Sequence, residues 1–305
     1  MRPTRPRVAI AACRAFDGAE ATDIYPDPDW PLLSAALVDA GADAISISWD
    51  HEDFDWQHFD LVVMNSTWDS VDRPQEFLAW ARRTARATTV MNPLRAVAWN
   101  IDKGYLRALA SRGVSIVPTQ WVVDAERWVP PPYEFVVKPS ISAGGRQTAR
   151  YSPEDLSAAV GHVQRLVDQG QTVMVQPYMA SVDSQGETKL VFIDGDFSHA
   201  VRVGPLLAAG EGVIERLWER AVPMDVTVPT AQLGTARDVL AAVQAEVPDS
   251  LLYARVDLFT GDAGEPLLGE VELVDPSLLL RFATHAAGRL AAAITARARQ
   301  RIPRT

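Results

Sequence analysis

The chain has 305 residues, of which 48% are hydrophobic and 22% are charged, as in an ordinary globular protein. It carries 29 lysines and arginines against 39 acidic residues, so its formal net charge is −10. An acidic chain without a clustered basic face is a poor candidate for binding nucleic acid or an anionic membrane surface. We expect any polyanion that it binds to be small and accompanied by a metal ion. At this length, two or three domains are expected.

The only cysteine is Cys13, which excludes an internal disulfide and a cysteine-cluster metal site and fits a reducing cytoplasm. We expect Cys13 to be a small buried residue near the end of the first strand. The apolar run at residues 8–13 is too short for a signal peptide, and no other run could span a bilayer. The sequence therefore predicts a cytoplasmic protein.

Residues 1–95 predict a small α/β domain with a parallel sheet. Apolar and alternating segments predict strands at residues 7–13, 44–49, 61–64 and 88–91. Helical spacing after a proline predicts helices at residues 28–41 and 74–83.

Polar residues follow the predicted strand at residues 61–64, at the edge where open α/β sheets bind ligands. For this reason we assign Asn65, Thr67 and Asp69 to the substrate site. An alternative stays open, because Ser66, Thr67 or Asp69 could instead cap the following helix.

Two further segments, residues 96–180 and 181–305, each predict a mixed α+β lobe. The first is expected to contain helices at 100–109 and 153–167, strands at 114–118 and 172–176, and an apolar run at 135–138 that leads into a loop. The second is expected to contain a hairpin of residues 186–193 and 197–203, helices at 230–245 and 283–301, and strands at 251–259 and 266–274.

The stretch Phe135 to Thr148 reads FVVKPSISAGGRQT. A short apolar run leads to Lys138 and then to a loop of small residues at 140–145, whose backbone N–H groups can approach an anion closely. Such a loop can hold the phosphates of a nucleotide, although it matches neither a Walker A loop nor the GxGxxG fingerprint. The alternative is an ordinary strand and turn with Lys138 at an exposed strand end.

Three carboxylates occur on the last two predicted strands, Asp257 in ARVDLF and Glu270 and Glu272 in LLGEVELVDP. The period of two places Glu270 and Glu272 on one face, and we expect Leu268 to continue that face. Neighbouring carboxylates repel one another unless a cation lies between them, and Mg²⁺ is the natural candidate. A solvent-facing polar stripe is the alternative.

The order of these parts resembles the ATP-grasp superfamily, which includes glutathione synthetase and D-alanine–D-alanine ligase. The resemblance covers roughly residues 92–280 and depends on an ordered set, namely Lys103, Lys138 with its loop, Gln176-Pro177-Tyr178, Arg202, Asp257, and Glu270-x-Glu272. It implies an ATP-grasp architecture, in which a small N-terminal α/β domain precedes two lobes that sandwich ATP.

Roles for individual residues follow from the resemblance. It implies ATP contacts for Lys103, Lys138, Ser142, Gly144, Gly145, Gln176, Pro177, Tyr178 and Asp183, with residues 140–145 as a mobile lid and Asp183 at the ribose. It implies a metal site of Asp257, Glu270 and Glu272, where Glu272 replaces the usual asparagine and adds charge. Mg²⁺ is expected there, and Mn²⁺ is an acceptable substitute.

The implied reaction transfers the γ-phosphoryl group of ATP to a substrate carboxylate, and an amine then attacks the acyl phosphate. Lys138, Arg202 and Arg255 are the expected catalytic residues, and Lys189 is assigned to the substrate. Arg202 or Arg255 could instead be a structural partner of Glu187 or Asp257.

The segments WNIDKGYL, KPSISAGG, FSHAV and GEVELVDPSLLL look most like a branch similar to prokaryotic glutathione synthetase. That branch includes a cyclo-ligase that closes O-ureido-serine to cycloserine, which implies a small amino-acid-like substrate and ring closure to D-cycloserine. An intermolecular amino-acid or peptide ligase, and a non-catalytic nucleotide-binding module, stay open as alternatives. A homodimer is compatible with the sequence.

Overall fold

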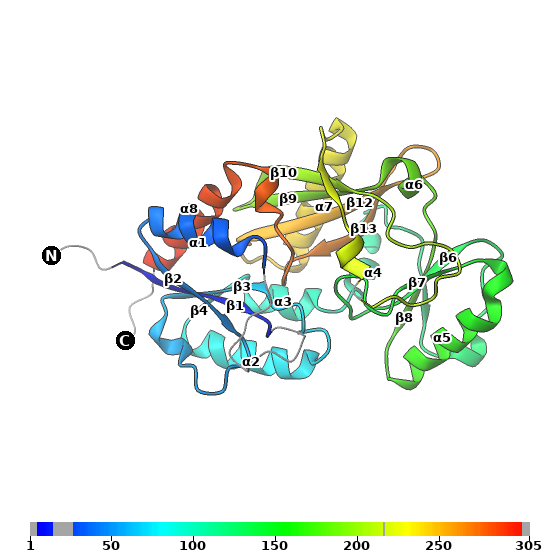
Figure 1. The fold of residues 1–305 in the computed structure, drawn as a ribbon, viewed down its shortest axis with the longest axis horizontal. Coiled ribbons are helices and arrows are strands. Elements are labelled where there is room, and N and C mark those ends of the chain that lie inside the picture. Colours follow the sequence, from blue (N-terminus) through cyan, green and yellow to red (C-terminus); the bar gives the residue numbers. More distant parts are fainter. Residues whose placement is uncertain (1–4, 15–26, 216, 301–305) are drawn as a thin grey trace.

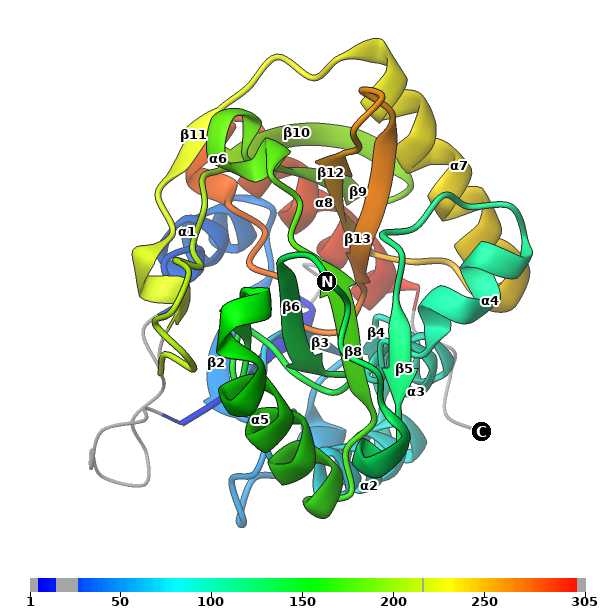
Figure 2. The same ribbon diagram turned by 90° about the vertical axis from the view of Figure 1, so that its right-hand side faces the viewer.

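The computed structural model describes residues 5–14, 27–215 and 217–300, which form three sheets (Figures 1 and 2). Each of the three segments expected from the sequence contains one sheet. No helix in these residues is long and apolar enough to cross a membrane. Cys13 is fully buried just beyond the first strand, as predicted.

The first sheet is parallel, with strand order β2-β1-β3-β4. Its strands are β1 (Arg7–Ala12), β2 (Asp43–Ser48), β3 (Leu61–Ser66) and β4 (Thr89–Met91). Alternate residues of β1 and β3 enter two different cores. One core includes α1 (Trp30–Asp39) and the C-terminal α8 (Ala286–Arg299), and the other includes α2 (Pro74–Ala87). The last helix of the chain therefore covers the first sheet.

The second sheet is antiparallel, with strand order β5-β8-β6-β7. It consists of β5 (Gln120–Val122), β6 (Phe135–Pro139), β7 (Ala149–Tyr151) and β8 (Val173–Pro177). Helix α5 (Leu156–Asp168) packs its apolar face on this sheet through Ala159, Val163 and Leu166.

The third sheet is also antiparallel, with strand order β11-β10-β9-β12-β13. Its strands are β9 (Glu187–Ile193), β10 (Asp196–Val203), β11 (Pro223–Asp225), β12 (Tyr253–Thr260) and β13 (Pro266–Glu272). Leu190 and Phe192 of β9 face α7 (Thr230–Glu246), whereas Val191 and Ile193 face α8. The second face is apolar beneath α8, and Glu187 and Lys189 continue it at the other end of β9.

Two sequence-based expectations about secondary structure were wrong. The single helix expected at residues 100–109 is instead two helices, α3 (Leu94–Asn100) and α4 (Tyr105–Ser111). The chain breaks between them because the Asp102 carboxylate accepts the Gly104 N–H and the Lys103 N–H donates to Ser140 O. The strand expected at 114–118 is reduced to one isolated bridge between Ile116 and Leu268.

The remaining short helices lie in the connections. They are α6 (Ser181–Gln185) and the 3₁₀ turns Trp56–His58, Ala125–Arg127, Pro153–Asp155, Leu217–Arg220 and Leu280–Phe282.

Candidate active site

The hairpin of β12 and β13 gathers three carboxylates. Asp257 lies opposite Glu270, and Arg255 lies opposite Glu272, in antiparallel register. Carboxylate oxygens of Asp257, Glu270 and Glu272 all lie within 4.8 Å of one another. The spacing of two residues therefore brings these side chains to one face, as the sequence analysis predicts.

The expectation that Leu268 continues this face was wrong. The register shifts at the next pair, so that Leu268 pairs with Leu258 and enters the apolar core. The extra residue is Gly269, where an added Cβ would lie 2.4 Å from the Phe259 ring. This β-bulge turns the acidic end of β13 toward the cleft while the preceding residues stay buried.

Two side chains from the helical segment fix the outer edge of β13, which is the last strand of its sheet. Asn100 donates to Val271 O at 2.8 Å and accepts from Leu273 N at 2.8 Å. The Tyr105 hydroxyl makes 2.8 Å hydrogen bonds with both the carbonyl and the N–H of Val271. These bonds satisfy an otherwise unpaired edge and hold the backbone between Glu270 and Glu272.

Positively charged side chains also lie beside these carboxylates. Lys189 Nζ lies 2.6 Å from Asp257 Oδ2 and 2.9 Å from Glu187 Oε2. Burial disfavours the charged lysine, but the carboxylates of Asp257 and Glu187 outweigh burial and raise the pKa of Lys189. Lys189, assigned to the substrate from sequence, therefore carries its positive charge between two acids.

Arg255 is buried beside the same acids. Its Nε and one terminal nitrogen donate to the two Asp257 oxygens at 2.8 Å, and that nitrogen also contacts Glu272. Its other terminal nitrogen donates to Ser277 O at 3.1 Å. The guanidinium fork is thus occupied by Asp257, the structural partnership that the sequence analysis left open.

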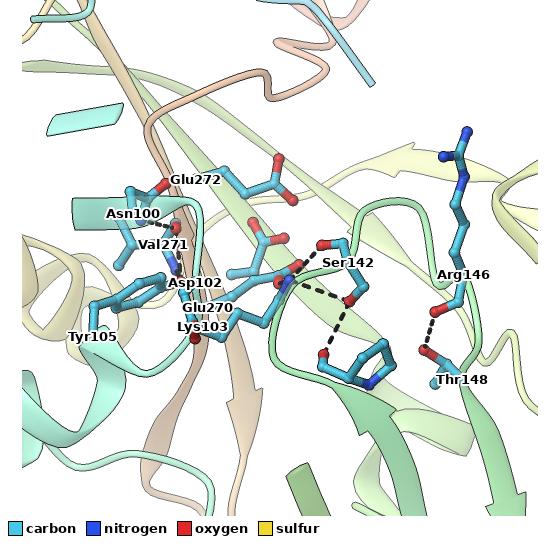
Figure 3. Close-up of polar contacts among 12 residues, drawn as sticks. Asn100, Asp102, Lys103, Tyr105, Ser142, Arg146, Thr148, Glu270, Val271 and Glu272 are labelled. Atoms are coloured by element: carbon cyan, nitrogen blue, oxygen red, sulfur yellow. Dashed lines mark hydrogen bonds and ion pairs between the residues drawn. The ribbon is translucent and has the colours of Figure 1, made fainter. Parts of the chain in front are cut away.

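The Gly-rich loop meets this hairpin at Lys103, as Figure 3 shows. Lys103 Nζ lies 2.5 Å from Ser142 O and 3.4 Å from Glu270 Oε2. Burial favours a protonated Glu270, but the charges of Lys103, Lys138 and Lys189 hold its pKa far below the usual range. Burial lowers the pKa of Lys138, with Lys103 adding to the effect and Glu270 opposing it.

Glycine is required at two positions of the loop. Gly144 and Gly145 have φ values of 60° and 73°, which favour glycine. An added Cβ would lie 3.0 Å from Trp218 Cε3 at the first position and 2.7 Å from Leu217 Cδ2 at the second. The loop is therefore covered closely by the 3₁₀ turn Leu217–Arg220.

A cavity of about 190 Å³ lies between this loop and the second sheet. Its walls include most of the residues predicted to contact ATP, namely Lys103, Lys138, Ser142, Gly144, Gly145, Gln176, Pro177 and Tyr178. Asp183 does not line it, but Asp183 Oδ1 accepts a 2.5 Å hydrogen bond from the hydroxyl of Tyr178.

A second cavity, of about 420 Å³, opens on the other side of Lys103. Both cavities are lined by Lys103, Glu270 and the loop residues 142–145. The larger cavity is also lined by Arg255, Glu272, Asp275 and the segment that follows β3. The Lys103–Glu270 pair therefore stands at the boundary between the two cavities.

The residues assigned to the substrate after β3 are not the ones that reach this cavity. Asn65, Thr67 and Asp69 are buried and do not line it, whereas the adjacent Trp68 and Ser70 do. The Asp69 carboxylate accepts two hydrogen bonds of 2.7 Å, one from the Trp49 indole and one from the Arg73 guanidinium. Asn65 donates at 3.1 Å to Asp27.

Arg202 is also misplaced for the expected catalytic role. In the register of β9 and β10, Arg202 pairs with Thr188, while Val201 and Val203 pair with Lys189 and Glu187. Arg202 therefore points to the sheet face opposite the acids, and it lines neither cavity. An offset of one residue along a strand reverses the face of a side chain, and the register of this hairpin could not be predicted from the sequence.

Sequence reasoning missed several residues around the cavities. Glu187 lines the smaller cavity and Asp275 the larger one, and Trp218 covers the loop. Period-two spacing from Lys189 could have identified Glu187. Trp218 lies in a short 3₁₀ turn and Asp275 in an irregular segment, and neither is long enough to show a periodic pattern in the sequence.

Two adjoining cavities, two lysines beside a Gly-rich loop, and carboxylates on the last hairpin define an ATP-grasp ligase. D-alanine–D-alanine ligase from Bacillus anthracis, solved with ATP, shares this fold with a TM-score of 0.62 at 13% identity, covering 97% of this chain and 98% of that one. ATP-grasp ligases use ATP together with a divalent cation.

A family model described as the N-terminal domain of D-cycloserine synthetase DcsG matches residues 8–92. The cycloserine biosynthesis protein DcsG of Streptomyces lavendulae is 35% identical, over 91% of this chain and 96% of that protein. A crystal structure of D-cycloserine synthetase DcsG superimposes with a TM-score of 0.84 at 34% identity, covering 96% of this chain and 99% of that one. The chain belongs to the DcsG family.

The donor set fits a hard divalent cation. Three carboxylates supply only oxygen ligands, and Glu270 and Glu272 line the larger cavity with an oxygen of each close to the other. Asp257 is fully buried, and both its oxygens accept hydrogen bonds from Arg255 or Lys189. Glu270 and Glu272 are therefore the accessible ligands, with Asp257 behind them.

Proposed function

We propose that this chain uses ATP to close O-ureido-D-serine to D-cycloserine. The observation that carries the proposal is the shared wall of Lys103 and Glu270, which would place the end of a triphosphate beside the carboxylate of a small substrate. The membership in the DcsG family supports the choice of substrate, because the relatives are described as proteins of cycloserine biosynthesis.

The reaction begins at the substrate carboxylate, which is a poor electrophile. One carboxylate oxygen attacks the γ-phosphorus of ATP, and ADP leaves with the electrons of the broken P–O bond. The oxygen-bound nitrogen of the ureido group then attacks the acyl carbon and loses its proton, and phosphate leaves. Water removes the carbamoyl group as carbon dioxide and ammonia, which accounts for all atoms between substrate and product.

Phosphate contacts are assigned to Lys103 and Lys138, together with backbone N–H groups of Ser142, Gly144 and Gly145. Their fixed positive charges would stabilise the charge that spreads over the transferred phosphoryl group. Closure of the loop at residues 140–145 would keep water from the acyl phosphate.

The adenine and ribose are assigned to the other end of the smaller cavity. Gln176, Pro177 and Tyr178 line that cavity and are proposed to hold the adenine. Asp183 is proposed to bind the ribose, next to Tyr178.

The cation is proposed to be Mg²⁺, for which Mn²⁺ can substitute, bound by Glu270 and Glu272 with Asp257 completing the acidic set. When bound, it would neutralise charge on the phosphate oxygens. Arg255 and Lys189 are proposed to neutralise part of the negative charge of these carboxylates and to hold them in position on the substrate side.

Ring closure needs one substrate besides ATP, whereas an intermolecular ligase needs two. Purified protein with ATP, Mg²⁺ and O-ureido-D-serine as the only amine source is expected to release ADP and D-cycloserine in equal amounts. Release of ADP only after a second amino acid is added would instead indicate an intermolecular ligase. No ADP under either condition would contradict both reactions and favour a non-catalytic nucleotide-binding protein.

We propose domain boundaries near residues 95 and 180, and a homodimer. Limited proteolysis and analytical ultracentrifugation would test them.

A further inference from the structure

The larger cavity has an acidic group that the proposed phosphoryl transfer does not use. Four carboxylates of the described residues line this cavity, namely Asp29, Glu270, Glu272 and Asp275. A zwitterionic substrate brings an α-ammonium group as well as a carboxylate, and a buried ammonium needs an acidic partner. The question is which of the four is available.

Three of them are already occupied. Asp29 is buried, and its two oxygens accept the backbone N–H groups of Leu279 and Leu280, each at 2.8 Å. Glu270 pairs with Lys103, and Glu272 pairs with Arg255. These two also form the accessible part of the cation site.

Asp275 differs from all three. Among the residues that the structure describes, its carboxylate has no ion pair within 4.0 Å, and its hydrogen-bond partner is the Ser70 hydroxyl at 3.4 Å. Burial raises its pKa to about 7, and the more distant Lys103 only partly offsets this. A half-buried carboxylate without a cationic partner can bind a cationic group of a ligand.

The position of Asp275 is fixed by contacts with the segment after β3. The Trp68 indole N–H donates to Asp275 O at 2.9 Å, and Trp68 and Ser70 both belong to the segment after β3. Asp275 lies three residues beyond Glu272, which limits their Cα separation to about 10 Å in an extended chain. Within that span, the carboxylate of the substrate can lie beside the cation site. Its ammonium group, which is on the adjacent carbon, can then lie beside Asp275.

We propose that Asp275, supported by Ser70, binds the α-ammonium group of the substrate and thereby orients its carboxylate toward the phosphates. This assignment rests on the proposed function for the identity of the ligand. It makes Asp275 a residue that selects α-amino acids over carboxylic acids of the same shape.

The test compares O-ureido-D-serine with its des-amino analogue, 3-(ureidooxy)propanoate, in wild type and Asp275→Asn. The asparagine has the same shape but no charge. We expect kcat/KM for O-ureido-D-serine to fall roughly 10- to 100-fold, the range for losing a hydrogen bond to a charged group. The des-amino analogue is expected to change less than about threefold, since it makes no such bond.

The matched control is Asp262→Asn, in the exposed turn between β12 and β13, which should leave both substrates unchanged. Equal losses with both substrates would overturn the assignment, because a merely structural Asp275 affects them alike. Unchanged kcat/KM for O-ureido-D-serine would overturn it too. Binding of Mg²⁺–ADP by Asp275→Asn, measured by calorimetry, verifies that the variant is folded.

Calorimetry also separates this proposal from the proposed reaction. If wild type binds O-ureido-D-serine but releases no ADP, the reaction is wrong, and the Asp275 assignment is decided by the same two-ligand comparison of dissociation constants. If wild type binds neither ligand in the presence of Mg²⁺–ADP, both proposals are overturned.

Discussion

The two walls of the larger cavity are built in different ways. The β12–β13 hairpin presents Glu270 and Glu272 to the cavity and balances them with Arg255, Lys189 and Lys103. The segment after β3 has an acid as well, but Asp69 turns away from the cavity toward Trp49 and Arg73. We propose that the acids of the hairpin take part in the chemistry, whereas Asp69 pairs with side chains inside the protein and its neighbours Trp68 and Ser70 line the cavity.

Acids that line the cavity should therefore be tested for effects on turnover, and acids paired inside the protein for effects on stability. Of the carboxylates placed by strand alternation, Glu270 and Glu272 line the larger cavity, whereas Asp257 is buried behind them. A carboxylate in a tight loop is usually used to satisfy buried donors. Four substitutions test this distinction between the two walls.

Glu270→Gln should have the largest effect. It removes an accessible cation ligand and the partner of Lys103, so we expect kcat to fall roughly 10²- to 10³-fold, as for loss of a key electrostatic group. Steady-state ADP release measures this. Glu265→Gln, in the exposed turn of the same hairpin, is the control. Near-normal turnover in Glu270→Gln would contradict a role of this hairpin in catalysis.

Asp69→Asn should act on stability instead of turnover. The amide can still accept from Trp49, but it loses the charged partner of Arg73, which keeps Asp50. We expect the free energy of unfolding in urea to fall by about 1–2 kcal/mol, with kcat unchanged. Asp238→Asn, exposed on α7, controls for loss of a charge. A specific loss of substrate binding in Asp69→Asn would restore the original assignment of Asp69 to the substrate.

Gly145→Ala should weaken nucleotide binding. The added Cβ faces Leu217 at 2.7 Å, and the left-handed backbone adds about 1 kcal/mol of strain. We expect the strain and the close contact together to raise KM for ATP roughly tenfold, which corresponds to about 1.4 kcal/mol of lost binding free energy. Gly170→Ala has the same kind of backbone strain, with φ 76°, but meets no atom within 4 Å. If both variants bind ATP equally well, close packing of the loop is irrelevant to binding.

Ser70→Ala should have the smallest effect. It removes the hydroxyl that donates to Asp275 while leaving Trp68 in place. Loss of one neutral donor costs about 0.5–1.5 kcal/mol, so KM for O-ureido-D-serine should rise a few-fold at constant stability. Ser111→Ala, at the exposed end of α4, is the control. An unchanged KM would show that the segment after β3 does not influence the substrate.

Parts of this molecule that repeat with a short period could be predicted from sequence. The three-sheet organisation and the gathering of Asp257, Glu270 and Glu272 follow from alternation along strands. The bulge at Gly269 could not be predicted, because it depends on the Phe259 ring that would meet a Cβ there. The face of Arg202 depends on hairpin register, which one sequence does not fix.

Irregular segments were the least predictable part of the site. The sequence identified the segment after β3 as a ligand-binding region but selected Asn65, Thr67 and Asp69 where Trp68 and Ser70 face the cavity. Tertiary partners far away in sequence, such as Trp49 for Asp69, decide which side chains turn inward. Asp275 was missed for the same reason, since its position depends on Trp68.

We propose that the substrate carboxylate is activated by phosphorylation at the boundary between the two cavities. The most direct measurement uses O-ureido-D-serine labelled with ¹⁸O in both carboxylate oxygens and follows the label in inorganic phosphate by ³¹P NMR. We expect one ¹⁸O atom in each phosphate released, because the carboxylate oxygen that attacks phosphorus leaves with it. Unlabelled phosphate formed together with D-cycloserine would contradict it.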